Sequence, residues 1–400
     1  MGRSTLGAPT ARGGGFPASA PAGDGVKLRP MHPTPDALTA LRDALAGWYH
    51  ARRRRLPWRE DPSPYRVWIS EIMLQQTQVA TVLPYFDRFV AAFPDVAALA
   101  AAPEQDVLAL WSGLGYYRRA RHLHEAAREV VAQHGGAVPE DPAALMRLKG
   151  VGPYTAAAIS SIAFGRPAAV LDGNVSRVLA RLVAEERPVD TAPVQRDQWA
   201  LAEALLDPAD PASHNQAMME LGALICSPRT PDCGGCPAAP WCDARRLGRP
   251  LDFPKKAGRT VVKSVYAVCG LATREDGTLL LARRPDDVLL GGLWELPGDE
   301  LPHARARRRD AVTAAFEARL GLAVAVDGHL ATVEHVFTHR RLTLDVYAVR
   351  GPVPDPPTRR WYTDAAWVDR AAPDAVPLSR LTHKVLAAVA APRATPGGPR

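Results

Sequence analysis

Four of the five cysteines in this 400-residue chain lie within seventeen residues, and their spacing is the first sign of chemistry. They are Cys226, Cys233, Cys236 and Cys242, separated by six, two and five residues. Four thiolates on one short stretch can hold a metal centre, because each ligand can turn inward towards the same point. Prolines and glycines around them suit a wrapped loop, since they break helices and permit tight turns.

Three structures can account for this cysteine cluster. Disulfide bonds would require an oxidising compartment, and no secretory signal peptide precedes the cluster. Structural zinc is chemically possible, but zinc sites usually pair two close knuckles, and the six–two–five spacing lacks that symmetry. The spacing resembles the iron–sulfur loop of the endonuclease III superfamily of DNA repair glycosylases. This resemblance favours a [4Fe–4S] cluster that is structural or positions DNA-binding loops.

Glu71 is a candidate general acid on a predicted amphipathic helix. Apolar residues at positions 65, 68, 69 and 72 share one face of this helix, and Glu71 lies at the margin of that face. A partly desolvated carboxyl group there could keep its proton near neutral pH and donate it. The alternative is an ordinary helix glutamate that faces solvent.

Asp172 is a second candidate carboxylate, at the start of a run that reads Asp-Gly-Asn-Val-Ser-Arg. An aspartate before a helical run is most often an N-cap. An ionised aspartate near a sugar would also stabilise the oxocarbenium-like cation that forms as a base departs. The two roles are compatible, because the cap would fix the orientation of the carboxylate.

Residues 141–163 predict two helices joined by a hairpin. Asp141 can cap the first helix, and a proline suits the first turn of the second. The tight turn at Gly150, Val151 and Gly152 would aim backbone N–H groups and a helix N-terminus outward, where they can hold a DNA phosphate. An ordinary helical turn is the alternative, since Gly-x-Gly between helices is common.

The chain divides at the cysteine loop. Helical spacing of apolar residues predicts an all-helical domain over residues 36–225, and residues 226–242 form the loop. Residues 243–260, rich in Pro, Arg and Lys, indicate a solvated linker. Residues 1–35 and 389–400 lack a periodic apolar pattern, so we expect a disordered leader and a disordered tail.

A second domain is predicted over residues 261–388. Strands are expected at 261–273 and 278–283, joined as a hairpin by the turn Asp276-Gly277. Further elements are a helix near 304–320 and strands near 331–336 and 341–350.

Size and charge fit a nucleic-acid partner without proving one. The formal net charge of +7 favours an anionic partner. The basic runs 52–55 and 118–121 could contact phosphate or form solvated helix faces.

No apolar run is long enough to cross a membrane. The leader could also reflect an overlong start, with Met31 as initiator, or a transit peptide, although it lacks a clear amphipathic helix. We expect a monomeric, intracellular protein in the cytoplasm or associated with the nucleoid.

Six motifs, in order, resemble the adenine DNA glycosylases of the MutY family over roughly residues 36–385. The resemblance implies a multidomain α plus α/β protein: an all-helical helix-hairpin-helix glycosylase domain with an iron–sulfur loop, then a Nudix-like C-terminal domain. The motifs are Leu56–Arg59, Trp68–Thr77, Gly113–Tyr117, Gly150–Ala156, Leu171–Val175 and Asn215–Ala223.

The resemblance implies a role for each motif residue. Glu71 would protonate adenine at N7 and later activate water, and Asp172 would stabilise or transiently capture the sugar cation. Tyr154 and Asn174 would hold the backbone and these carboxylates in place. Bifunctional relatives carry a lysine right after Gly-Val-Gly-Arg, which forms a Schiff base with the sugar. Because Tyr154 stands there in this chain, we expect a monofunctional glycosylase.

Other motif residues are expected to contact the DNA bases. The target adenine must leave the base stack to reach the carboxylates. For the tryptophans and Tyr116, simple core packing is the alternative. Residues expected to line the adenine pocket are Trp58, Arg59 and Glu220, and residues expected to face the opposite base are Leu74, Gln76 and the wedge Tyr116.

The second domain resembles a Nudix fold through Gly292–Gly298 and its order of strands and helices. Nudix hydrolases hold Mg²⁺ with several glutamates on one helix. Aligning that box on Gly321 puts alanines and Arg319 at those positions, so we expect a binding module without hydrolase activity.

The run Phe337-Thr338-His339 resembles a Phe-Ser-His run that recognises 8-oxoguanine in the family. The Thr338 hydroxyl could accept a hydrogen bond from the lesion N7–H, a donor that guanine lacks.

The expected activity is hydrolytic removal of adenine from 8-oxoguanine:adenine or guanine:adenine mispairs in duplex DNA, within base excision repair. A bifunctional pyrimidine glycosylase/lyase is the main enzymatic alternative. A non-enzymatic iron–sulfur protein that binds DNA or transfers electrons is another alternative. A Nudix nucleotide hydrolase is the third.

Overall fold

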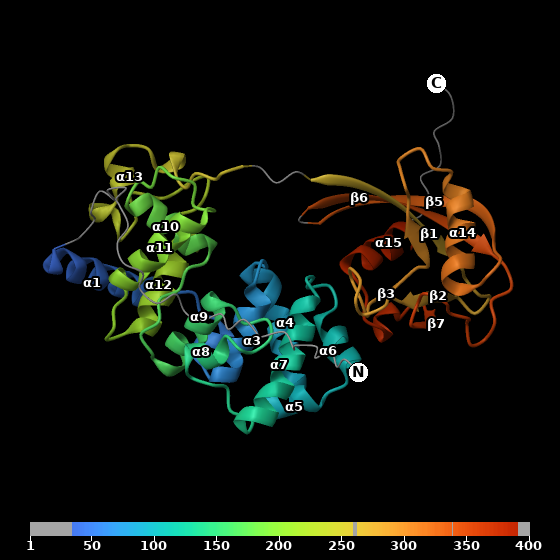
Figure 1. Ribbon diagram of the computed structural model, residues 1–400, viewed down its shortest axis with the longest axis horizontal. Coiled ribbons are helices and arrows are strands. Elements are labelled where there is room, and N and C mark those ends of the chain that lie inside the picture. Colours follow the sequence, from blue (N-terminus) through green and yellow to red (C-terminus); the bar gives the residue numbers. More distant parts are fainter. Residues whose placement is uncertain (1–33, 259–261, 338, 391–400) are drawn as a thin grey trace, which may run out of the picture.

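The computed structural model describes residues 34–258, 262–337 and 339–390, which form a helical region followed by a mixed α/β region (Figure 1). Most of the expected leader and tail, and Thr338, lie outside the described residues. Within the described ranges, no helix is both long and apolar enough to span a bilayer.

The helical region contains two hydrophobic cores. One gathers α3 to α7 around Trp68, Phe86 and Trp111, and the other packs α1, α10 and α12 around Leu41 and Leu221. The helices are α1 (Pro35–Arg52), α2 (Pro57–Glu60), α3 (Pro64–Leu74), α4 (Val79–Ala92), α5 (Val96–Ala101), α6 (Glu104–Trp111), α7 (Arg118–His134), α8 (Pro142–Leu145), α9 (Pro153–Phe164), α10 (Gly173–Leu182), α11 (Ala192–Leu205) and α12 (Pro211–Leu224).

Helix α9 belongs to both cores. Ala156 and Ile159 pack in the first core, whereas the adjacent Ala157 and Ala158 pack in the second. Small side chains let the helices of both cores approach α9 closely. The first turn of α9, which carries Tyr154, therefore lies at the junction of the two cores.

The predicted caps are confirmed. Asp141 accepts a hydrogen bond from the Ala144 N–H at 3.0 Å and begins α8, and a proline opens α9. Gly150 has a φ of +80°, in the left-handed region that favours glycine, so the turn between α8 and α9 needs this residue.

The first part of the segment expected as a linker is packed on the helical region, so the expectation of a solvated linker was wrong there. The ring of Phe253 is 1% exposed, and the Lys255 carbonyl accepts a bond from the Val189 N–H at 3.0 Å. The few scattered apolar side chains of this segment, among basic residues and prolines, gave too little signal to predict this contact. The short elements here are η1 (Ala239–Trp241), α13 (Asp243–Arg246) and η2 (Pro250–Asp252).

The α/β region has two sheets, with strand orders β4-β1-β6-β5 and β3-β2-β7. Strand β1 runs parallel to β6, and the other pairs are antiparallel. Consecutive residues of β1 pack on helices at opposite faces of the sheet, Val268 with α14 and Cys269 with α15. The elements are β1 (Lys263–Leu271), β2 (Thr278–Arg283), β3 (Trp294–Glu295), β4 (Gly298–Glu300), α14 (Arg308–Leu320), β5 (Ala325–Val336), β6 (Arg340–Arg350), β7 (Asp364–Asp369), η3 (Pro373–Ala375) and α15 (Arg380–Ala390).

The predicted hairpin forms only beside its turn, where the Leu280 N–H bonds the Ala272 carbonyl at 3.1 Å and the Arg274 N–H bonds the Thr278 carbonyl at 3.0 Å. The Asp276 carboxylate accepts a bond from the Thr278 N–H at 2.9 Å, and Gly277 has a φ of +84°. Beyond one bridge between Thr273 and Leu279, however, β1 and β2 join different sheets. The turn signal is local, whereas the partner of β1, strand β6, is far along the chain.

The two regions meet at the turn between α6 and α7. The Leu378 carbonyl accepts bonds from the Ser112 hydroxyl at 2.9 Å and from the Tyr117 hydroxyl at 2.8 Å. Leu293, from the loop between β2 and β3, is buried in the first helical core. Arg121 forms an ion pair with Asp286, so part of the basic run 118–121 has a structural partner.

Candidate active site

Glu71 is buried in the helical region with its carboxyl group held by Tyr154. The residue is only 5% exposed, and the Tyr154 hydroxyl donates a hydrogen bond to its Oε2 at 2.8 Å. Burial is the largest cause that raises the pKa of Glu71 to about 7; the bond from Tyr154 lowers this pKa, and the nearby charge of Asp172 raises it. A carboxyl group with this pKa can carry a proton at neutral pH and release it.

Tyr154 is aimed at Glu71 by the start of α9. Burial, together with the charges of Glu71 and Asp172, raises the pKa of Tyr154 well above its usual value, so its hydroxyl stays protonated. The thioether sulfur of Met219 lies 3.2 Å from the same hydroxyl. The single phenolic proton can serve the carboxylate, or turn to Met219 when Glu71 itself carries a proton.

Asp172 is the N-cap of α10, as its sequence predicted. Its Oδ1 accepts bonds from the backbone N–H groups of Asn174 and Val175 at 3.0 and 2.7 Å. Its Oδ2 accepts a bond from the Asn174 side-chain amide at 2.9 Å. These three donors fix the carboxylate at a helix N-terminus, where a negative charge is favoured.

Asn174 is held in turn by α12 and the cysteine loop. Arg177 donates to the Asn174 Oδ1 at 2.9 Å and to the backbone carbonyls of Gly222 and Cys226, both at 2.8 Å. A Cβ at Gly222 would lie 2.7 Å from the Cβ of Asn174, so only glycine permits this approach. A continuous set of contacts therefore leads from Asp172 to the first cysteine of the loop.

The residues expected to line the adenine pocket surround one buried carboxylate. Glu220 is 1% exposed and accepts bonds from Arg54 and, at 3.0 Å, from Arg59. Burial raises the pKa of Glu220, but the bonds from the two arginines outweigh it and lower the pKa to about 2. Glu220 thus orders the arginines, and Trp58 is buried with its ring edge-on to Phe86.

Two residues expected to face the opposite base have unusual backbone conformations. Gln76, just beyond α3, has a φ of +57°, and Tyr116, just before α7, has a φ of +49°. Tyr116 is also a large aromatic side chain that is 47% exposed. Its exposure agrees with a wedge and excludes simple core packing. Leu74, at the end of α3, packs partly against the first core.

The four cysteines of the loop line one small cavity together with Arg181. Burial raises the pKa of Cys236 to about 11, with further contributions from the charges of the other three thiols. Arg181, itself 2% exposed, donates to the Cys226 sulfur at 3.3 Å and to nearby backbone carbonyls. A buried cation beside several thiols suits a group that carries negative charge through its thiolates.

Four thiols that line one cavity are a candidate ligand set for a metal centre, and Arg181 would complement the negative charge of its thiolates. Within the described ranges, no group of three or more His, Cys, Asp or Glu side chains is arranged to hold a single metal ion.

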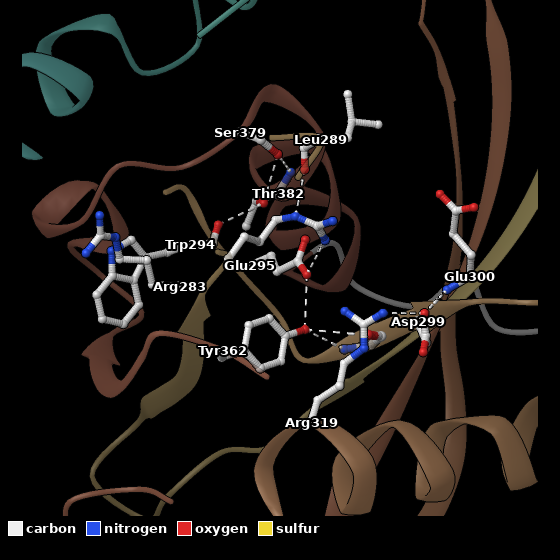
Figure 2. Close-up of polar contacts among 12 residues, drawn as sticks. Arg283, Leu289, Trp294, Glu295, Asp299, Glu300, Arg319, Tyr362, Ser379 and Thr382 are labelled. Atoms are coloured by element: carbon white, nitrogen blue, oxygen red, sulfur yellow. Dashed lines mark hydrogen bonds and ion pairs between the residues drawn. The ribbon is translucent and has the colours of Figure 1, made fainter. Parts of the chain in front are cut away.

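The Nudix-like region holds paired charges where a hydrolase would hold metal ligands. Figure 2 shows Arg319, on α14, paired with Asp299 and lying near Tyr362. The Arg319 guanidinium also stacks on the ring of Trp361, 3.9 Å from its centroid. Glu295 accepts a bond from the Tyr362 hydroxyl at 3.0 Å (Figure 2) and forms an ion pair with Arg284. These carboxylates are neutralised by arginines.

A cavity of about 260 Å³ lies between β1, β6 and α15, beside these ion pairs. Phe337 reaches its edge and stacks edge-on with His335, with ring centroids 4.6 Å apart. Phe337 and the exposed His339 belong to the tight turn between β5 and β6, where the Phe337 N–H bonds the Arg340 carbonyl. Of the expected lesion contacts, Phe337 and His339 thus lie between β5 and β6 of the α/β region.

Several residues that organise the site had no sequence signal. They are arginines, three inside helices and Arg54 in the segment after α1, with partners that lie far along the chain. A sequence shows their charge but not those partners, so a solvated or phosphate-binding face was the natural expectation. These residues are Arg54, Arg119, Arg177 and Arg181.

Comparisons with known proteins identify the family of the chain. Residues 69–203 match the HhH-GPD superfamily of base excision DNA repair proteins, and residues 268–388 match the NUDIX domain. The adenine DNA glycosylases of Mus musculus and Homo sapiens are each 38% identical to this chain and cover 82% of it; the aligned parts span 74% and 70% of those proteins. A solved structure of a thermostable thymine-DNA glycosylase has a TM-score of 0.49, at 30% identity over 52% of this chain and 97% of that chain.

The helical region and its carboxylates therefore define a base excision DNA repair protein of the helix-hairpin-helix class. The relatives and the second region narrow this class. The chain belongs to the adenine DNA glycosylase family.

Replacement of Glu71 by Gln should stabilise the protein in a pH-dependent way. The unfolded carboxyl ionises near pH 4.5 and the folded one near pH 7, so the wild type loses stability as pH rises between these values. The variant cannot ionise and should be more stable at pH 8 by roughly 3 kcal/mol, with little difference below pH 4.5. Denaturant unfolding followed by circular dichroism would measure this difference.

The matched control is Glu203→Gln on α11, where the side chain is exposed. This control should change stability equally at both pH values. A Glu71→Gln difference that is the same at pH 4.5 and pH 8 would contradict the raised pKa.

Proposed function

We propose that this protein hydrolyses the N-glycosidic bond of adenine in duplex DNA and leaves an abasic site. The observation that carries the proposal is the buried Glu71 carboxyl group, which accepts a bond from Tyr154 and lies close enough to Asp172 for their charges to interact. A proton donor beside a fixed anion is the pair of groups that glycosidic bond cleavage requires. The proposed activity is that of the family.

The first step uses the proton of Glu71. With a pKa of about 7, Glu71 can hold this proton at neutral pH and transfer it to adenine N7. Protonation turns the base into a neutral leaving group as the bond to the sugar breaks. Tyr154 then stabilises the carboxylate that remains, because its hydroxyl donates to Oε2.

The second step uses the charge of Asp172. Its three hydrogen-bond donors hold the carboxylate in one orientation, so it needs little reorganisation when the sugar becomes cationic. Water then adds its oxygen to the sugar carbon, and the released proton returns to the Glu71 carboxylate. Because Tyr154 stands where bifunctional relatives carry a lysine, no imine forms and the strand stays intact.

The adenine must leave the stack, and the opposite base must be recognised. The side chains of Trp58 and Arg59, ordered by Glu220, would surround the flipped adenine. Leu74, Gln76 and Tyr116 would meet the opposite strand. Preference for 8-oxoguanine would come from the segment Phe337, Thr338 and His339. The DNA backbone would be held by the turn Gly150, Val151 and Gly152.

We also assign a [4Fe–4S] cluster to Cys226, Cys233, Cys236 and Cys242. The bound cluster would tie together a loop that has no hydrophobic core of its own. Through Arg177, the loop supports Asn174 and hence Asp172. We further propose that the protein acts as a monomer in the cytoplasm, close to the nucleoid.

A single-turnover assay tests the function directly, with a duplex that contains one 8-oxoguanine:adenine pair. Product that appears only after alkali treatment is expected, because adenine is removed while the backbone stays intact. Strand breaks without alkali would instead indicate a lyase. Absence of product, from protein with the visible absorption of the cluster, would indicate a DNA-binding protein and overturn the proposal.

Glu71→Gln should bind the same duplex normally and lose adenine release by roughly 10²- to 10⁴-fold, since Gln cannot donate the required proton. The wild-type rate should fall about tenfold per pH unit above pH 7, because only protonated Glu71 is active. Glu203→Gln serves again as the control. Near-normal single-turnover cleavage by Glu71→Gln would remove Glu71 from the role of acid.

Thr338→Ala should narrow the preference for 8-oxoguanine:adenine over guanine:adenine. The hydroxyl is the proposed partner of the lesion N7–H, and Ala removes it without adding bulk. The measurement is the ratio of single-turnover rates on the two duplexes. An unchanged ratio would exclude Thr338 from recognition.

Cys236→Ser should lose bound iron and the visible absorption of the cluster. Serine keeps the shape of the side chain but provides no thiolate ligand. Iron and sulfide analysis per chain is the measurement. Cys269→Ala is the matched control, because Cys269 is buried in the other region and should leave the iron content unchanged. Equal iron content in both variants would refute the ligand assignment.

A further inference from the structure

The loops that carry Gln76 and Tyr116 share a backbone feature that costs free energy. Both residues have positive φ values, +57° and +49°, although neither is glycine. Such conformations are unfavourable for residues other than glycine and persist only where surrounding contacts hold them. The two loops are far apart in the sequence, so some tertiary contact has to hold both.

Arg119, in the first turn of α7, makes that contact. Its Nη1 donates to the backbone carbonyls of Ile72, Met73 and Gln75 at 2.9, 2.8 and 2.6 Å. Helix α3 ends there, and the last carbonyls of a helix lack partners within it. The guanidinium therefore closes the C-terminal end of α3, where a cation also complements the helix dipole.

The other side of the same guanidinium holds the second loop. Its Nη2 donates to the Gly115 carbonyl at 3.1 Å and to the Thr77 hydroxyl at 3.2 Å. The guanidinium carbon lies 5.4 and 5.3 Å from the ring centroids of Trp111 and Tyr116. The planar guanidinium of Arg119 thus contacts Gln75 and Thr77, on either side of Gln76, and also Gly115, the residue before Tyr116.

Arg119 remains charged despite its surroundings. Burial lowers its pKa to about 10, which still leaves it protonated at neutral pH. Among the described residues, its hydrogen-bond partners are backbone carbonyls and a hydroxyl, and none is a carboxylate. A buried arginine that only stabilised the fold would cost less free energy if it were paired with an acid, as Arg54 is paired with Glu220.

We propose that Arg119 is a positioning residue that sets Gln76 and Tyr116 side by side, so that both enter the duplex at the mispair together. This inference rests on the proposed function. Lysine cannot replace Arg119, because an ammonium group has three donors on one atom and no planar face to stack on the rings. The residue acts through the two loops and does not touch the reacting atoms.

The test compares Arg119→Lys with Arg128→Lys on the same helix, where the exposed Arg128 donates from Nε to the Ala100 carbonyl at 3.2 Å. Flipping is followed by the fluorescence of 2-aminopurine placed opposite 8-oxoguanine, and excision by single-turnover rates on the 8-oxoguanine:adenine duplex. Arg119→Lys should slow excision by roughly 10- to 100-fold, the effect of misplaced groups, with a matching loss of the fluorescence change. Arg128→Lys should change neither.

Two further readouts separate positioning from a general loss of structure. Affinity for undamaged duplex and the alkaline limb of the pH–rate profile near pH 7 should stay as in the wild type, because the phosphate contacts and Glu71 are intact. An Arg119→Lys rate within twofold of the wild type would overturn the inference. So would a shifted alkaline limb, since Arg119 would then act through Glu71.

Arg119→Lys could fail to fold, so Thr77→Val provides a second, milder variant that should keep the fold. It removes one of the bonds to Arg119 while preserving side-chain shape, and it should lower both readouts by about twofold to fivefold, the worth of one weak hydrogen bond. Unchanged readouts would count against the inference. A wild-type protein that releases no adenine would defeat the proposed function itself, which is a different outcome from an active wild type with unaffected variants.

Discussion

The burial of one carboxyl group is the constraint on which the rest of the helical region depends. Glu71 is 5% exposed, and a carboxylate without partners at that depth would be strongly unfavourable. The partner of the Glu71 carboxylate is the Tyr154 hydroxyl, which lies on α9, a helix that packs in both cores. A single core could not bring α3, the start of α9 and the start of α10 to one point. The acid therefore lies where the two halves of the region meet.

Arginines connect this point to the surrounding structure. Arg177 links Asn174 to the cysteine loop, and Arg54 and Arg59 neutralise the buried Glu220. Arg119 closes the helix that carries Glu71. Each guanidinium offers several donors in a fixed plane, so it can hold segments that are distant in sequence. The positive charge of these four arginines therefore has a structural role within the helical region.

How far the sequence could predict this structure depends on the range of each interaction. Asp141 and Asp172 were recognised as caps because a cap is a local bond, and the bounds of β2 follow from a local turn. The pairing of β1 with β6 and the packing of Phe253 were missed, since both depend on contacts made far along the chain. The burial of Glu71 could be predicted only in part. Helical spacing placed Glu71 at the margin of the apolar face, and the packing of α9 then determined its exposure.

In the α/β region, ion pairs occupy the acidic side chains that a metal site would need. On α14, Arg319 occupies a position where a hydrolase would need an acid, and its charge is satisfied by Asp299 and by the ring of Trp361. With Glu295 also paired to Arg284, a divalent cation would have to displace guanidinium groups to find ligands. The Arg319–Asp299 pair also ties α14 to β4, the strand beside β1 in the sheet that contains β5 and β6. The same ion pairs therefore oppose binding of a cation and support the sheet.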